Sequence, residues 1–96
     1  MQSAERTATT DPLTSLPNAR SLFVQLDAEL ARAKRGNTPL TILTLDLNGL
    51  KGINERYGQL HGNRILAQVA KRLKQSCREY DYVARMGGDE FVILLP

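Results

Sequence analysis

The sequence predicts an α/β fold of the α+β kind, with a central antiparallel sheet and helices on its faces. An apolar, β-branched run from Leu40 to Leu47 is typical of a buried strand. Two further apolar runs flank Gly87-Gly88 and predict a β-hairpin, because glycines supply the positive φ angles of a tight turn. Amphipathic helical patterns precede the first strand and the hairpin, which gives the order helix, strand, helices, two strands.

The first helix is predicted from Asn18, as its N-cap, to about Arg35, with Gly36 as its stop. Its expected apolar face consists of Leu22, Phe23, Leu26, Leu30 and Ala33. After the strand, a short helical segment is expected from Leu50 to about Arg56, ended by Tyr57-Gly58.

A basic amphipathic helix is predicted from about Asn63 to Arg78. Its apolar stripe consists of Ile65, Leu66, Val69, Leu73 and Cys77, opposite Arg64, Lys71, Arg72, Lys74 and Arg78. A solvated helix face explains this pattern, and no aromatic platform or nucleic-acid motif accompanies the net charge of +3. Nucleic acid is therefore not an expected partner.

The composition fits one globular domain without a second core. The chain has 96 residues, of which 42% are hydrophobic and 24% charged, and it has no internal repeat. The single cysteine, Cys77, is expected to be a core residue in a reducing compartment. No run is long enough to cross a bilayer, so a cytoplasmic location is expected, which leaves open whether the parent protein is tethered to a membrane.

Acidic residues occur at the ends of two predicted strands. Asp89 and Glu90 follow the glycine turn of the hairpin, and Asp46 lies where the first strand enters a polar loop. By themselves these residues also suit a solvated hairpin and a helix cap. If the strands are neighbours, however, the three carboxylates converge, and clustered oxygen ligands favour Mg²⁺ or Mn²⁺.

The chain resembles the GGDEF-domain diguanylate cyclases. The resemblance rests on four motifs in register, which are Asp11-Pro12-Leu13-Thr14-Ser15-Leu16-Pro17-Asn18, Asp46-Leu47-Asn48-Gly49-Leu50-Lys51-Gly52-Ile53-Asn54, Tyr57-Gly58 with Gly62-Asn63, and Gly87-Gly88-Asp89-Glu90-Phe91. It covers the chain from Asp11 to Pro96. Several independent motifs in the same order are far more specific than one glycine pattern.

The resemblance implies a nucleotide-cyclase-like palm that condenses two GTP molecules into cyclic di-GMP and releases pyrophosphate. Asp46 and Asp89 would hold Mg²⁺ or Mn²⁺, helped by the backbone carbonyl of Leu47 and by Glu90. Asp89 would also help to deprotonate the attacking 3′-hydroxyl. An alternative is a degenerate module that binds cyclic di-GMP or GTP as a sensor, without turnover.

The resemblance also implies substrate contacts. Gly49, Leu50 and Lys51 match the loop that approaches the phosphates, although a solvated Lys51 is equally consistent with the sequence. Asn54 matches a guanine-binding position, with a helix C-cap as the alternative.

Position 63 departs from the family pattern, because active members usually carry aspartate where this chain has Asn63. An amide offers one acceptor and one donor group, so it would oppose one guanine N–H and lower GTP affinity. The same pair of groups suits an adenine edge, so relaxed purine use is an open alternative. Smaller departures are Asn48, Gly49-Leu50 and Gln59.

A further motif precedes the hairpin. Arg78 and Asp81 match the family's Arg-x-x-Asp inhibitory product site, in which the arginine grips phosphate or guanine of the product and the aspartate accepts from guanine. As a bare pattern the same pair suits a surface salt bridge.

The resemblance predicts the domain limits and partners as well. Residues 1–12 are expected to be a linker or the end of a signalling helix, and residues 13–96 a truncated GGDEF domain that lacks the C-terminal part of the palm. The truncated domain is expected to be inactive alone and to self-associate. The expected partners are GTP, cyclic di-GMP, a second GGDEF domain in a homodimer, and a sensory or receiver domain of the parent protein.

Overall fold

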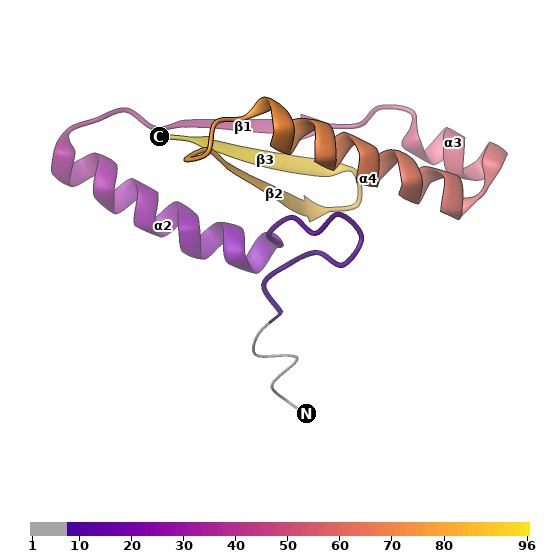
Figure 1. The fold of residues 1–96 in the computed structure, drawn as a ribbon, viewed down its shortest axis with the longest axis horizontal. Coiled ribbons are helices and arrows are strands. Elements are labelled where there is room, and N and C mark those ends of the chain that lie inside the picture. Colours follow the sequence, from indigo (N-terminus) through magenta and orange to yellow (C-terminus); the bar gives the residue numbers. More distant parts are fainter. Residues whose placement is uncertain (1–7) are drawn as a thin grey trace.

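The computed structural model describes residues 8–96, so the first seven residues of the predicted N-terminal linker lie outside the described part. Three helices and three strands follow in the predicted order (Figure 1). They are α2 (Ala19–Gly36), β1 (Thr41–Asp46), α3 (Leu50–Tyr57), α4 (Gln59–Ser76), β2 (Tyr82–Gly87) and β3 (Glu90–Leu95). The α+β fold class predicted from the sequence is confirmed.

The three strands form one antiparallel sheet in the order β1-β3-β2. In the register of β1 with β3, Thr41 lies opposite Leu95 and Asp46 lies opposite Glu90. In the hairpin, Tyr82 lies opposite Leu94, and an irregularity between Arg85 and Gly87 shifts the register before the turn. The last strand in the sequence is therefore the central strand of the sheet.

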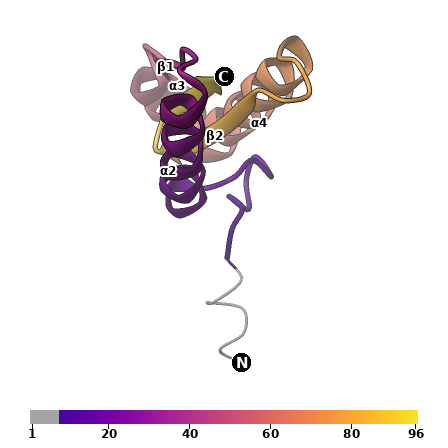
Figure 2. The same ribbon diagram turned by 90° about the vertical axis from the view of Figure 1, so that its left-hand side faces the viewer.

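Alternation along β3 divides the core into two clusters on opposite faces of the sheet, because successive side chains of a strand point to opposite faces. On one face, Phe91 and Ile93 pack with residues of α4, and on the other, Val92 and Leu94 pack with Leu22 of α2. Seen end-on, α2 and α4 lie on opposite sides of the sheet (Figure 2). The result is a helix–sheet–helix arrangement.

Local signals set the ends of α2 much as predicted. Asn18 is the N-cap, and its side chain accepts a hydrogen bond from the backbone N–H of Ser21 at 3.0 Å. At the other end Gly36 is the last helical residue, and Asn37 adopts the left-handed conformation (φ 52°) that closes the helix.

Burial differs from the prediction in α2 and β1. Phe23 and Leu30 were expected on the apolar face of α2, yet they are 54% and 48% exposed. Strand β1 was expected to be buried, but most of its residues are exposed. The physical reason is its position at the edge of the sheet, where β3 pairs with it on one side only.

Helix α4 begins at Gln59, four residues earlier than predicted, and follows α3 after the single residue Gly58. Gly58 has a φ angle of 96°, which favours glycine and lets the chain turn sharply between the two helices. The predicted apolar stripe is confirmed, because Leu66 is buried and its other members pack against the same cluster.

The fully buried ring of Phe91 gives a direct test of the core. Phe91→Ala should lower the free energy of unfolding by about 3–5 kcal/mol, because it leaves a cavity in the centre of the sheet. Urea denaturation measures this change. Phe23→Ala is the matched control, since Phe23 is half exposed, and an equal loss in both variants would contradict the assignment of Phe91 to the core.

Candidate functional site

The acidic residues of β1 and the hairpin come together at one end of the sheet. Asp46 is the direct cross-strand partner of Glu90, and the backbone N–H of Leu47 donates to the carbonyl oxygen of Asp89 at 3.0 Å. Gly87 and Gly88 have the predicted positive φ angles, 148° and 53°. The two turn residues are nevertheless Gly88 and Asp89, because Gly87 is the last residue of β2 and pairs with Glu90. The two strands are therefore neighbours, which places Asp46 opposite Glu90, but the predicted convergence of all three carboxylates is not found within residues 8–96.

These residues offer oxygen ligands, which a hard divalent cation prefers, but they do not form a complete set of metal ligands. Within residues 8–96, no three carboxylate, imidazole or thiol side chains are gathered closely enough to hold a metal ion. Mg²⁺ usually takes one or two carboxylates together with water and substrate phosphates. The residues present fit that mode of binding, in which a bound polyphosphate completes the coordination.

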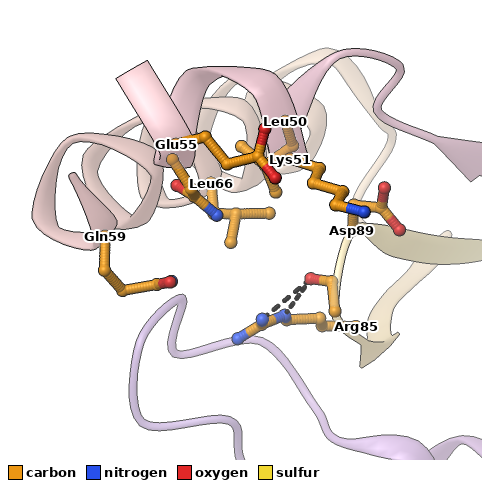
Figure 3. Close-up of a pocket in the computed structure, with 9 residues that line it drawn as sticks. Leu50, Lys51, Glu55, Gln59, Leu66, Arg85 and Asp89 are labelled. Carbon is orange, nitrogen blue, oxygen red and sulfur yellow. Dashed lines mark hydrogen bonds between the residues drawn. The ribbon is translucent and has the colours of Figure 1, made fainter. Parts of the chain in front are cut away.

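A cavity of about 450 Å³ lies between the α3–α4 pair and the hairpin. Four of the predicted site residues line it, namely Leu50, Lys51, Asn54 and Asp89. In Figure 3, Lys51 and Asp89 extend toward each other at one side, while Leu66 lies on the floor between the two helices. The predicted residues Asp46, Leu47, Gly49, Asn63 and Glu90 are not among its lining residues.

Asn54 is held by a close approach between α3 and α4. Gly62 of α4 is buried, and a Cβ atom at this position would collide with the side-chain amide of Asn54. The Oδ1 atom of Asn54 is buried and has no hydrogen-bond partner among the described residues. A buried polar atom without a partner is costly, so a ligand that donates to Asn54 would relieve this cost.

Asn63 lies one turn along α4 from the start of the helix and interacts with Gln59. The Nε2 atom of Gln59 donates to Oδ1 of Asn63 at 3.0 Å. Gln59 lines the cavity, and its side chain points into it (Figure 3). The sequence had marked Gln59 only as a departure from the family pattern.

The structure also brings in two residues that the sequence had not marked as part of the site, Arg85 and Asp11. The Nη1 atom of Arg85 lies 3.0 and 3.1 Å from the two carboxylate oxygens of Asp11, and both side chains are mostly buried. The same guanidinium donates to the carbonyl oxygen of Gly88 at 2.8 Å, in the turn of the hairpin. The N-terminal loop is therefore joined to the turn that contains Asp89.

Three further hydrogen bonds support this connection. The backbone N–H and the hydroxyl of Thr14 both donate to Asp11, at 2.9 and 2.8 Å, and the backbone N–H of Arg85 donates to the carbonyl oxygen of Pro17. Asp11 and Arg85 are 74 residues apart in the chain, so no local pattern could have paired them. The available signals were the presence of Asp11 in the first motif and the position of Arg85 two residues before Gly87.

Arg78 and Asp81 form a compact turn away from the cavity. Asp81 Oδ2 accepts from the backbone N–H of Arg78 at 2.9 Å and lies 3.6 Å from its Nε. The guanidinium is exposed and lies 4.8 Å from the centre of the Tyr80 ring. Asp81 is buried, and its Oδ1 has no hydrogen-bond partner within residues 8–96.

The pH dependence of stability tests the Asp11–Arg85 pair. Burial tends to raise the pKa of Asp11, but the hydrogen bonds from Thr14 and Arg85 outweigh it and hold that pKa below its ordinary value. A carboxyl group with a lowered pKa contributes stability above its unfolded pKa and loses it as the pH falls through its folded pKa. Asp11→Asn should therefore cost about 1–3 kcal/mol at pH 7, and this cost should become progressively smaller as the pH falls below about 4.

Denaturation of both proteins between pH 3 and pH 7 measures this difference. Asp27→Asn, on the exposed face of α2, is the matched control and should show no such dependence. A constant cost of Asp11→Asn at all pH values would show that the charge of Asp11 does not stabilise the fold.

Comparison with known proteins identifies the family of the chain and several relatives. Residues 8–96 match the family model described as "Diguanylate cyclase, GGDEF domain". The chain is 41% identical over 96 residues to diguanylate cyclase DgcP of Pseudomonas aeruginosa, and 39% identical over 89 residues to the response regulator PleD of Caulobacter vibrioides. These matches cover 100% and 93% of the chain, but only 14% and 20% of the relatives.

Solved structures show the same fold. The GGDEF domain of DgcB from Caulobacter crescentus, in complex with c-di-GMP, has a TM-score of 0.90 at 34% identity, and the match covers 95% of this chain and 53% of that one. Diguanylate cyclase SiaD of Pseudomonas aeruginosa, in complex with its activator SiaC, has a TM-score of 0.90 at 36% identity, with 98% of this chain and 36% of that one covered. The chain therefore belongs to the family of GGDEF diguanylate cyclase domains.

Proposed function

We propose that the chain is the part of a diguanylate cyclase domain that binds GTP and carries the catalytic carboxylates. The observation that carries this proposal is the cavity in which Lys51 and Asn54 of α3 face Asp89 of the hairpin. Asp46 and Glu90 lie beside each other at the same end of the sheet. A nucleotide with its base near Asn54 and its phosphates toward Lys51 and Asp89 would use all of these groups.

In this proposal the base and the phosphates are held by different elements. The buried Oδ1 of Asn54 accepts from a donor on the base, and Leu50 and Leu66 give an apolar floor beneath the ring. Lys51 and the backbone after Gly49 approach the phosphates. Gly49 has a φ angle of 86° and no Cβ, so a phosphate can approach its backbone closely.

The carboxylates supply the chemistry of the phosphoryl end. Asp46, Asp89 and Glu90, with the carbonyl of Leu47, would hold Mg²⁺ or Mn²⁺, which when bound neutralises the triphosphate and the charge that develops at phosphorus. Asp89 accepts the proton of the 3′-hydroxyl of the second GTP. The 3′-oxygen then bonds to the α-phosphorus as the bond to pyrophosphate breaks, and a second such step closes the ring of cyclic di-GMP.

Two GTP molecules must face each other for this reaction, so the proposed active form is a homodimer of GGDEF domains. The relatives suggest further partners, because PleD is a response regulator and SiaD was crystallised with an activator protein. We propose that a sensory or receiver domain of the parent protein controls the pairing. The boundary between the linker and the domain, placed at residues 12 and 13, belongs to the same proposal.

The site lies in a part of the chain without membrane-spanning character. Within the described residues, no helix is both long enough and apolar enough to cross a bilayer. We propose that the domain lies in the cytoplasm, because its proposed substrate GTP is a cytoplasmic nucleotide.

A second candidate function is a sensor that binds cyclic di-GMP without turnover. It is favoured by the turn that contains Arg78 and Asp81, where an exposed guanidinium lies beside a buried carboxylate oxygen that has no partner within residues 8–96. Such a pair could accept from a guanine and donate to a phosphate. The DgcB GGDEF domain, which has the same fold, was crystallised in complex with c-di-GMP.

Removal of Asp89 tests the catalytic proposal. In the full-length protein, Asp89→Ala and Asp46→Ala should lower kcat by about a hundredfold or more and reduce the dependence on Mg²⁺, because loss of a metal ligand costs several kcal/mol of transition-state stabilisation. Pyrophosphate release from GTP measures turnover. Asp27→Ala, remote from the cavity, is the control, and an Asp89→Ala protein with most of its activity would show that the site is misassigned.

Removal of Arg78 tests the product-binding proposal. Arg78→Ala should weaken cyclic di-GMP binding by roughly tenfold or more, because it removes charge-assisted hydrogen bonds to phosphate. Titration calorimetry measures the affinity, and Arg72→Ala, an exposed arginine of α4, is the matched control. Equal affinities in the wild-type and Arg78→Ala proteins would refute this site.

A further inference from the structure

A second cavity, the loop cavity, has a volume of about 390 Å³ and lies between the N-terminal loop and α4. Leu16 and Pro17 line it from the loop, and the short side chains of Ala67 and Ala70 line it from the helix. None of its lining residues also lines the cavity beside Asp89. The loop cavity is therefore separate from the candidate functional site.

The loop cavity is apolar at its inner end and cationic at its mouth. Leu16 and Ala70 are buried, at 5% and 1% exposure, whereas its lining residues Lys71 and Lys74 are exposed. The two lysines are three residues apart and lie on the same side of α4, where their like charges repel each other. Within residues 8–96, neither lysine forms an ion pair and no acidic side chain lines the loop cavity. An anion at the mouth would relieve this repulsion.

Hydrogen bonds of the loop connect this cavity to the hairpin. Thr14, which also lines the loop cavity, donates to Asp11 through both its backbone N–H and its hydroxyl. The carbonyl oxygen of Pro17 accepts from the backbone N–H of Arg85 at 3.0 Å. The guanidinium of Arg85 in turn donates to Asp11 and to the carbonyl oxygen of Gly88. A molecule that holds the loop in place would therefore also restrict the turn of the hairpin.

From this geometry we propose that the loop cavity is a regulatory site for a small amphipathic anion, which has an apolar body and a single anionic group. The apolar body lies against Leu16 and Ala70, and the anionic group accepts hydrogen bonds from Lys71 and Lys74. The volume of the loop cavity falls within the range of small-molecule sites, roughly 300–1,000 Å³. Binding at this site does not depend on the proposed function, because it involves no nucleotide.

Two probes with the same ring and opposite charges test the class of ligand. The affinities of the full-length protein for 2-naphthoate and for 2-naphthylmethylammonium are measured by titration calorimetry at neutral pH. The anion should bind at least about tenfold more tightly, because only the anion can accept charge-assisted hydrogen bonds from the lysines. Equal affinities would overturn the anionic ligand, and absence of 2-naphthoate binding up to about 10 mM would overturn the site.

Removal of the two lysine charges tests the mouth of the loop cavity. The double variant Lys71→Gln/Lys74→Gln should weaken 2-naphthoate binding by roughly tenfold. The matched control is Arg64→Gln/Arg72→Gln, which removes two charges from exposed positions of the same helix that do not line the loop cavity. The control should bind 2-naphthoate as the wild type does. Equal losses in both double variants would show attraction by net charge alone and would overturn the site.

Filling the loop cavity tests its inner end. Ala67→Leu should abolish 2-naphthoate binding, because the larger side chain occupies the space that the ring needs. Leucine is a strong helix former, and Ala31→Leu on the exposed face of α2 is the control for the substitution itself. A folded Ala67→Leu protein with unchanged affinity would overturn the location. If this variant does not fold, the lysine double variant decides the question.

Hydrogen exchange tests the connection to the hairpin. Saturation with 2-naphthoate should slow exchange of the backbone amides of residues 86–90 by about threefold or more, because it restricts the loop that is bonded to the turn. Helix α3, which does not line the loop cavity, is the internal control. If 2-naphthoate binds and the hairpin amides exchange at an unchanged rate, the regulatory role is overturned. None of these measurements uses GTP, so their failure leaves the proposed function standing.

Discussion

The pairing of β3 with both other strands is the constraint on which the rest of the structure depends. As the central strand, β3 fixes the register of β1 through one edge and of β2 through the other. Its alternating side chains give each face of the sheet its own core, and the two faces receive α2 and α4. The same pairing brings the end of β1 to the hairpin, so Asp46 and Glu90 become neighbours without any local signal that joins them.

A second level of organisation connects the N-terminal loop to the hairpin. Arg85 has its donors divided between Asp11 and the carbonyl of Gly88, so the loop and the glycine turn share one guanidinium. Because these groups are mostly buried, movement of either partner would leave a charge without its counterpart. This connection holds the segment just before Asp89 in place and relates it to the part of the chain that precedes α2.

The packing of α3 against α4 fixes the position of a polar side chain at the cavity. The contact of α3 with α4 depends on Gly62, which leaves room for the side chain of Asn54 and holds its amide below the surface. A buried acceptor without a partner in the described residues lowers stability, and such atoms are commonly retained where a ligand uses them. Asn54 and Asp81 both have this character, and they lie in the two regions where the family resemblance implies guanine binding.

The sequence alone determined the order of the elements, the N-cap at Asn18, the hairpin and the family, because each of these is read from short runs of residues without knowledge of their tertiary contacts. It also marked Lys51, Asn54 and Asp89, which the structure brings to one cavity. Only the tertiary structure decided which strand is central and which lies at the edge, and for this reason the burial expected for β1, Phe23 and Leu30 was wrong. The hydrophobic pattern of a sequence shows which side chains are apolar, but whether a side chain is buried depends on which other segments pack against it. The Asp11–Arg85 pair, the Asn54–Gly62 contact and the position of Gln59 in the cavity likewise arise from segments that meet only in the folded chain.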